Sequence, residues 1–132
     1  MKKLILISAL LFSFNGWAYS ETDLGQLKAV GNCVRCDLSG ADLTRVNLMF
    51  ADLTGADLTG ANLRGVNLEY ALFQNANLTG ADFTGANLQS AFLYGAKLRS
   101  ADFTGANLRD ATLTGVKFCR TKMPWGKVND DC

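Results

Sequence analysis

The sequence predicts an all-β solenoid, a parallel β-helix of about 4.5 roughly square coils preceded by a short N-terminal capping helix. Two observations carry this prediction. A five-residue period runs without insertion from Cys36 to Trp125, as 18 units over 90 of the 132 residues. The octapeptide that begins at Ala81 also recurs identically from Ala101, twenty residues later. Four units therefore close one coil, and successive coils are expected to stack about 4.8 Å apart, like parallel strands.

Residues 1–20 are typical of a secretory signal peptide. Two lysines precede an eleven-residue apolar run, Leu4–Phe14, and small residues then allow cleavage after Ala18 or after Ser20, of which we prefer the second. The run is too short to span a bilayer, which takes about 20 apolar residues. We therefore expect a secreted or periplasmic protein whose mature chain has no stable membrane insertion. The sequence does not separate the periplasm from the extracellular space or a thylakoid lumen.

Residues 21–35 are expected to form an N-terminal cap. Leu24, Leu27 and Val30 follow one another at helical spacing within Thr22–Val30, and a Gly-Asn pair ends the pattern. The open end of a solenoid must be covered. A short helix is therefore expected to lay its apolar face over the first coil.

Residues 36–125 are the repeats. A period of five fits neither an α-helix nor a flat strand, and describes a chain that bends by a constant angle every five residues. The first residue of each unit is small or slim, and the third is Leu, Phe or Met. We expect the third-position side chains to fill the core: Leu38, Leu43, Leu48, Leu53, Leu58, Leu63, Leu68, Phe73, Leu78, Phe83, Leu88, Leu93, Leu98, Phe103, Leu108, Leu113, Phe118 and Met123.

The C-terminal end of the repeats carries its own capping signals. Pro124 cannot donate a hydrogen bond to a β-ladder, and Trp125 is large enough to cover the last core layer. We expect the ladder to end there and residues 126–132 to form a tail.

The units read A(D/N)LXX, as in Ala-Asp-Leu-Thr-Gly at 51–55 and Ala-Asn-Leu-Arg-Gly at 61–65. In this pattern the chain resembles the pentapeptide repeat family over 90 of its 132 positions. The resemblance implies a right-handed quadrilateral parallel β-helix, with the third residue at the core centre and the first beside it. It also implies an alternative function, the DNA mimicry by which quinolone-resistance proteins of this family bind and protect gyrase. Those proteins are acidic, cytoplasmic, usually longer and dimeric, whereas this chain is short, near neutral and expected to be exported.

The four cysteines flank the two ends of the repeats. Four cysteines allow three connectivities, and the two ends lie about 19 Å apart, beyond the reach of a disulfide. We favour Cys33–Cys36 together with Cys119–Cys132 as staples of the caps. Free thiols remain an alternative. A redox-active CxxC and a zinc site are disfavoured, because the CxxC lacks a βαβ context and the second pair lacks close ligand spacing.

Polar side chains also stack at intervals of twenty residues. Asp37 stacks with Asp57, and Asp82 with Asp102. Carboxylates about 5 Å apart resemble the pair of a retaining glycosidase and would have raised pKa values, which gives an envelope hydrolase as another alternative. Asp or Asn nevertheless fills the second position in 12 of the 18 units, so we interpret it as bonding the turn. We also interpret four stacked asparagines as a structural ladder: Asn47, Asn67, Asn87 and Asn107.

Departures from the repeat pattern are more informative about function. Leu72 and Phe92 replace the usual Asp or Asn, Phe50 and Tyr70 replace the common fifth-position glycine, and Tyr94 follows Phe92. We expect these five residues to converge on one edge over three coils and to form an interaction surface. The alternative is tolerated surface variation, since a short solenoid constrains only its inward positions.

The charge is distributed unevenly along the chain. Residues 21–95 carry four basic and eight acidic groups, a net charge of −4, whereas residues 96–127 have a net charge of +5. Lys97, Arg99 and Lys117 share one face and form a candidate basic patch. An anionic glycan, phospholipid head groups or an acidic protein surface would suit it. A solvated end that discourages end-to-end stacking is the alternative.

Composition excludes several kinds of chemistry. The chain has no histidine, which removes Ser-His-Asp and Cys-His nucleophiles and imidazole acid–base catalysis. Its formal net charge of +1 gives no overall field that attracts nucleic acid. We therefore expect a non-enzymatic, exported interaction or structural module without a cofactor or a nucleic-acid partner. The expected partner is a protein, or a second copy of the chain bound through the apolar edge or a cap.

Overall fold

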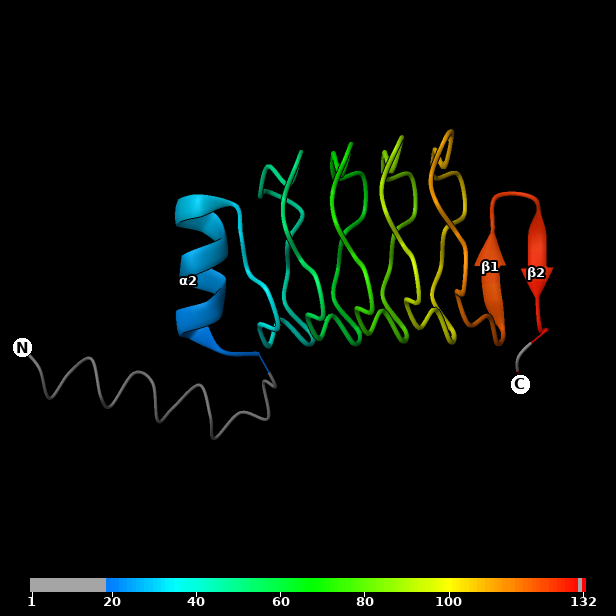
Figure 1. Cartoon of the computed structure of the whole chain (residues 1–132), viewed down its shortest axis with the longest axis horizontal. Coiled ribbons are helices and arrows are strands. Elements are labelled where there is room, and N and C mark those ends of the chain that lie inside the picture. The colour runs from blue at the N-terminus through cyan, green and yellow to red at the C-terminus, as the bar shows by residue number, and fades with distance from the viewer. Residues whose placement is uncertain (1–18, 131) are drawn as a thin grey trace, which may run out of the picture.

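The computed structural model describes residues 19–130 and Cys132, so residues 1–18 of the expected signal peptide lie outside the described residues. The helix α2 (Glu21–Val30) lies at one end of a stack of coils, and a hairpin lies at the other end (Figure 1). Strands β1 (Thr121–Met123) and β2 (Gly126–Val128) pair antiparallel in this hairpin. Strand β2 thus lies within the residues expected to be a tail.

Each pentapeptide ends in a tight turn. The N–H of Ala61, which begins a unit, donates to the backbone oxygen of Leu58 at 3.0 Å, and Gly60 between them has a φ of 66°. A positive φ at the third residue of a four-residue turn defines type II geometry, which glycine adopts without strain. Phe50 and Tyr70 occupy the same turn position with φ values of 61° and 59°.

Successive coils are joined by parallel β-bridges between residues twenty apart. Asp57 pairs with Asn77, and Asn77 pairs with Lys97. The backbone rungs alternate in direction: Leu58 N donates to Asn77 O at 2.8 Å, and Asn77 N donates to Ala56 O at 2.9 Å. The predicted coil of twenty residues is therefore confirmed, and the chain forms a parallel β-helix.

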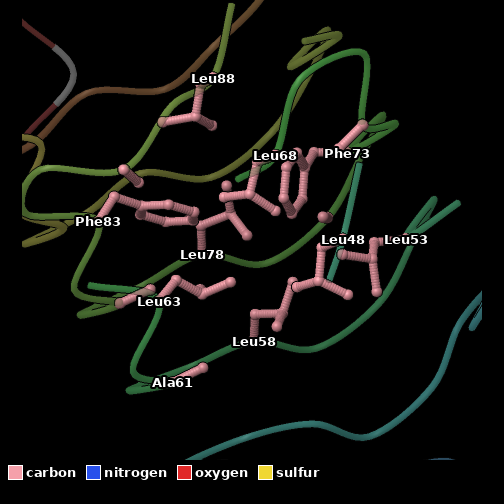
Figure 2. Packing of buried hydrophobic residues seen from close by; sticks show 14 of the residues in the cluster. Leu48, Leu53, Leu58, Ala61, Leu63, Leu68, Phe73, Leu78, Phe83 and Leu88 are labelled. Atoms are coloured by element: carbon pink, nitrogen blue, oxygen red, sulfur yellow. The ribbon is translucent and has the colours of Figure 1, made fainter. Parts of the chain in front are cut away.

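The core is the column of third-position side chains flanked by first-position alanines. Third-position residues from Leu38 to Phe103 are fully buried, and Figure 2 shows the side chains of those between Leu48 and Leu88 meeting inside the coils. Phe83 stacks on Phe103 at 4.6 Å between ring centroids and meets Phe73 edge-on at 6.0 Å. Near the C-terminal end Leu108, Leu113 and Phe118 also pack against the core, as predicted, but they are only half-buried because fewer coils cover the last layer.

Helix α2 lies at the N-terminal end of the coils and starts one residue earlier than expected. Ser20 caps the helix, because its Oγ accepts from the backbone N–H of Asp23 at 3.2 Å. Leu27 is buried and Leu24 half-buried against the core. The expected contribution of Val30 is wrong: its side chain is 65% exposed, in the last turn before the left-handed Gly31.

The expectation that Trp125 covers the last core layer is also wrong. Trp125 lies in the turn between β1 and β2 and is 64% exposed. Met123 in β1 is buried instead, at 3% exposure. Thr121 fixes this strand to the coil before it, because its buried Oγ1 donates to Leu98 O at 2.8 Å. A two-stranded hairpin here places alternate side chains inward and outward, and its turn projects the indole into solvent.

Candidate functional site

We use the name aromatic edge for Phe50, Tyr70, Leu72, Phe92 and Tyr94. The first two come from the fifth position of their units, at one corner of the β-helix. Their rings stack in parallel with centroids 5.0 Å apart and an interplanar angle of 5°. Phe50 is 62% exposed and Tyr70 is 40% exposed. The sequence prediction that one-coil spacing brings these two side chains together is met by this stack.

The remaining members of the aromatic edge lie on the face that follows this corner. Leu72 and Phe92 are bridge partners in one parallel ladder. Phe92 and Tyr94 are exposed, Leu72 is half-buried, and the Tyr94 ring reaches toward the corner at Gly115. The five residues thus form one pair of stacked rings, Phe50–Tyr70, one pair of ladder neighbours, Leu72–Phe92, and the neighbouring Tyr94. No ring contact joins the pairs within the described residues.

Sequence reasoning missed Met49 as part of this exposed surface. Met49 precedes Phe50 and is itself exposed, at 37%. The signal was present, because the fourth position of a unit is most often threonine and here is apolar.

The basic patch lines a pocket. Lys97, Arg99 and Lys117, all exposed, border a cavity of about 380 Å³ together with Asn77 and Thr79, and the tail residue Cys132 closes one side. Sequence reasoning placed the three cations on one face, but it gave no sign that the tail returns beside them.

The stacked aspartates accept hydrogen bonds from the turns that follow them. Asp37 pairs with Asp57, and Asp82 with Asp102, as parallel bridge partners. Oδ1 of Asp57 accepts from the hydroxyl of Thr59 at 2.6 Å and from its backbone N–H at 3.0 Å. The same two bonds recur at Asp82 and Asp102. These carboxylates therefore serve the turn that follows them.

The expectation of raised pKa values in this stack is wrong for Asp82 and Asp102. Partial burial acts to raise the pKa of Asp82, but hydrogen bonds from Thr84 and Arg64 outweigh it and hold that pKa below 3.8. The hydroxyl of Thr104 is the largest cause of the lowered pKa of Asp102. Hydrogen bonds to the ionised form favour it, so these carboxyls stay charged at neutral pH and cannot serve as general acids there.

The amide ladder is shorter than expected. Asn87 Nδ2 donates to Asn67 Oδ1 at 3.3 Å, and Asn107 Nδ2 donates to Asn87 Oδ1 at 3.0 Å. Asn47 does not join them, because its backbone makes no bridge to the next coil. The preceding turn differs from the others, since Arg45 lacks the positive φ of the fifth position.

The cysteines lie at the two ends of the β-helix. Cys33 is disulfide-bonded to Cys36, and Cys119 is disulfide-bonded to Cys132. Sγ of Cys33 lies 3.1 Å from the backbone oxygen of Asp23 in α2, so the first disulfide packs against the helix. Within residues 19–130 and 132, no group of three or more Cys, Asp or Glu side chains is placed to hold a metal ion.

The five-residue period and the twenty-residue coil are the features of a known family. The family model for pentapeptide repeats matches residues 32–69, 61–99 and 93–123, in eight copies. The chain belongs to the pentapeptide repeat family, whose members are right-handed quadrilateral β-helices. No curated protein sequence matched the chain significantly. In the part of the chain that the structure describes, no helix has the length and apolar character needed to cross a membrane.

Solved structures that resemble the chain are pentapeptide repeat proteins. HetL of the cyanobacterium Nostoc sp. PCC 7120, involved in the regulation of heterocyst differentiation, is 33% identical, with a TM-score of 0.37; the match covers 74% of this chain and 51% of HetL. A protein of the Arabidopsis thaliana thylakoid lumen is 28% identical, with a TM-score of 0.45, over 76% of this chain and 71% of that one. QnrB1, a plasmid-mediated fluoroquinolone resistance protein, is 23% identical over 66% of this chain and 62% of its own, with a TM-score of 0.37. This chain spans about half the length of HetL.

The lowered pKa values predict how stability depends on pH. Thr44 lowers the pKa of Asp42 in the same way, through its hydroxyl and backbone N–H. A carboxyl whose pKa is lowered by folding adds stability above its unfolded pKa and loses it as the pH falls through the folded value. Replacing Asp42, Asp82 and Asp102 together by Asn keeps the oxygen acceptors and removes these titrations. Urea denaturation between about pH 5 and pH 2 should then show a smaller loss of unfolding free energy than in wild type. Equal losses would contradict this account of the three carboxyls.

Proposed function

We propose that the chain is a non-enzymatic, exported binding module that contacts a protein partner through the aromatic edge. The proposal rests on one observation. Phe50 and Tyr70, two bulky exposed side chains, occupy left-handed turn positions. Six other non-glycine residues of the described chain also have a positive φ, Ser100 among them, so what distinguishes Phe50 and Tyr70 is that large aromatic side chains stand exposed at such positions.

The energetics of the turn support this interpretation. A residue with a Cβ in the left-handed region costs about 1–2 kcal/mol relative to the right-handed one, whereas glycine adopts it freely. The stacked pair Phe50–Tyr70 regains about 0.5–1.5 kcal/mol, while Phe50 stays 62% exposed and Tyr70 40% exposed. Folding therefore gains little from these two aromatics. An exposed aromatic surface instead suits a protein interface, where such residues are enriched.

The second positions of the same region support the proposal independently. In most units an Asp or Asn there bonds the following turn, as Asp57 does with Thr59. Leu72 and Phe92 have no side-chain acceptor, so their units forgo that bond and present apolar surface instead. Two successive coils therefore lack the side-chain hydrogen bond to the turn at Leu72 and Phe92, which belong to the aromatic edge.

The cysteines and the N-terminus support export. Disulfides persist in oxidising compartments, and the two cysteine pairs at the ends of the β-helix suit the periplasm or the extracellular space. We interpret α2 as the cap of the first coil and the stack as about 4.5 coils long, with the pairs as staples of its two ends.

The N-terminal contacts favour one of the two cleavage positions. Ser20 caps α2 through Asp23, its backbone N–H donates to Asp37 O at 2.9 Å, and Tyr19 packs against the core. Cleavage after Ser20 would remove all of these groups, whereas cleavage after Ala18 keeps them. We therefore propose that the leader ends at Ala18, in place of the Ser20 position preferred from the sequence.

The two alternatives have less support. A gyrase-binding DNA mimic calls for a strongly acidic surface, and residues 96–127 of this chain are basic. A hydrolase that uses the stacked aspartates needs a carboxyl that stays protonated near neutral pH, and the pKa values of Asp82 and Asp102 are shifted the other way. A restored supercoiling activity in drug-inhibited gyrase would favour the first alternative.

The aromatic edge is tested by charge insertion. Tyr70→Asp and Phe92→Asp should each abolish capture of a partner that wild type retains from envelope extract, because an interface core does not tolerate an unpaired carboxylate. Ser100→Asp is the matched control. It occupies the same turn position on another corner with a φ of 57°, and should retain the partner. All variants are checked for an unchanged unfolding midpoint.

Retention of every partner by Tyr70→Asp and Phe92→Asp would contradict the proposed surface. If sedimentation shows that the captured partner is a second copy of the chain, the surface is a self-association interface and the proposal of a different protein is wrong.

The cleavage position is tested on the exported protein. Intact mass and N-terminal sequencing should give a chain that starts at Tyr19. Ser20→Ala should lower its unfolding free energy by about 1 kcal/mol, because the helix loses its N-cap. A mature chain that starts at Glu21 would contradict this assignment.

A further inference from the structure

We propose that the pocket lined by Lys97, Arg99 and Lys117 binds the phosphate group of a small phosphorylated molecule. This pocket lies on the face after the one that carries Leu72 and Phe92. The inference does not depend on the proposed role of the aromatic edge.

The two lysines are neighbours in one β-ladder. Asn77 pairs with Lys97, and Lys97 pairs with Lys117. The rungs are intact on both coils, with Lys97 N donating to Ala76 O at 3.0 Å and Lys117 N to Ala96 O at 3.1 Å. Their side chains therefore leave the same face about 4.8 Å apart. Arg99 adds a third cation two residues after Lys97.

Such an arrangement is unfavourable without an anion. Like charges directly opposite each other on neighbouring strands destabilise a sheet. The ion pairs within the described residues use other cations, namely Arg64, Arg109 and Lys122. Among residues 19–130 and 132, no ion pair joins Lys97, Arg99 or Lys117 to an acidic side chain, and an oxyanion between the three cations would offset their repulsion.

The lysines also displace a residue that would stabilise the turn. On the coil before them, Asn77 Oδ1 accepts from the hydroxyl of Thr79 at 2.6 Å and from its backbone N–H at 3.2 Å. A lysine has no acceptor, so neither Lys97 nor Lys117 can make these bonds. At two successive coils a turn-bonding residue has been replaced by a cation, as would be expected if the charge serves a ligand.

The shape of the pocket indicates a small ligand. Its volume of about 380 Å³ lies at the lower end of the range of small-molecule sites. One wall is fixed: Cys119 O accepts from Ser100 N at 2.8 Å, and the disulfide from Cys119 holds Cys132 at the pocket. Arg99 offers the planar guanidinium fork that binds phosphate with two hydrogen bonds. The amide N–H groups of Asn77 stay available for a ligand hydroxyl, since its oxygen is the atom used by Thr79.

The proposal is tested by titrating the oxidised protein with glucose 6-phosphate in a calorimeter, with inorganic phosphate as a second probe. Lys97→Asn/Lys117→Asn restores the usual residue at both positions, so the variant should fold at least as stably as wild type. It should bind glucose 6-phosphate at least tenfold more weakly. Lys28→Asn/Lys127→Asn removes the same charge from exposed sites outside the pocket and should change the affinity by less than twofold.

A second experiment with lipid vesicles distinguishes a small phosphorylated molecule from a lipid headgroup as the source of the phosphate. Vesicles of phosphatidylcholine with phosphatidylglycerol present a phosphate as a lipid headgroup. Binding to vesicles that glucose 6-phosphate displaces, and that the pocket variant loses, would place both sources in this pocket and support the proposal. It is overturned if wild type does not bind glucose 6-phosphate, if the two double variants weaken binding equally, or if the protein binds only vesicles.

Discussion

The β-helix depends on a backbone conformation, the left-handed residue that closes a type II turn at the end of nearly every unit. Gly60 adopts it with a φ of 66°, and the bond from Ala61 N to Leu58 O closes the turn. Repeating this bend four times returns the chain to its starting side, so that residues twenty apart form parallel bridges. The ladder and the buried column of third-position side chains both follow from that register. The irregular unit at Arg45 shows the dependence, because without the positive φ Asn47 loses its bridge.

The same constraint separates positions that hold the fold from positions that are free to bind. First and third positions face inward and are filled by small and large apolar side chains. Second and fourth positions usually fasten the turn, as in the Asp57–Thr59 pair. A residue that departs from this pattern gives up local stability, so its chemistry is informative. The departures cluster as an aromatic edge on one side and as a basic pocket on the next face.

Much of the fold could be predicted from the sequence, because a strict period fixes the register without knowledge of long-range contacts. The ends could not, since no repeat constrains them. Val30 and Trp125 looked like capping residues by size and spacing, yet both are exposed, because the helix end and the hairpin turn set their directions. The pocket was only half predicted. Its three cations follow from the period of twenty, but its closure depends on where a disulfide places Cys132. The lowered pKa values of Asp82 and Asp102 could not be predicted either. They result from hydrogen bonds donated by threonines, and the repeat spacing does not show that these bonds outweigh the effect of burial.

Phe50 and Tyr70 are proposed to serve binding more than folding, and this can be measured directly. The measurement is the unfolding free energy of the double variant Phe50→Gly/Tyr70→Gly by urea denaturation. Glycine relieves about 1–2 kcal/mol of backbone strain at each turn, which offsets the lost stacking and the partial burial of the rings. The account predicts a free energy within about 1 kcal/mol of wild type. A loss of about 3 kcal/mol or more, the cost of truncating a core aromatic, would contradict it.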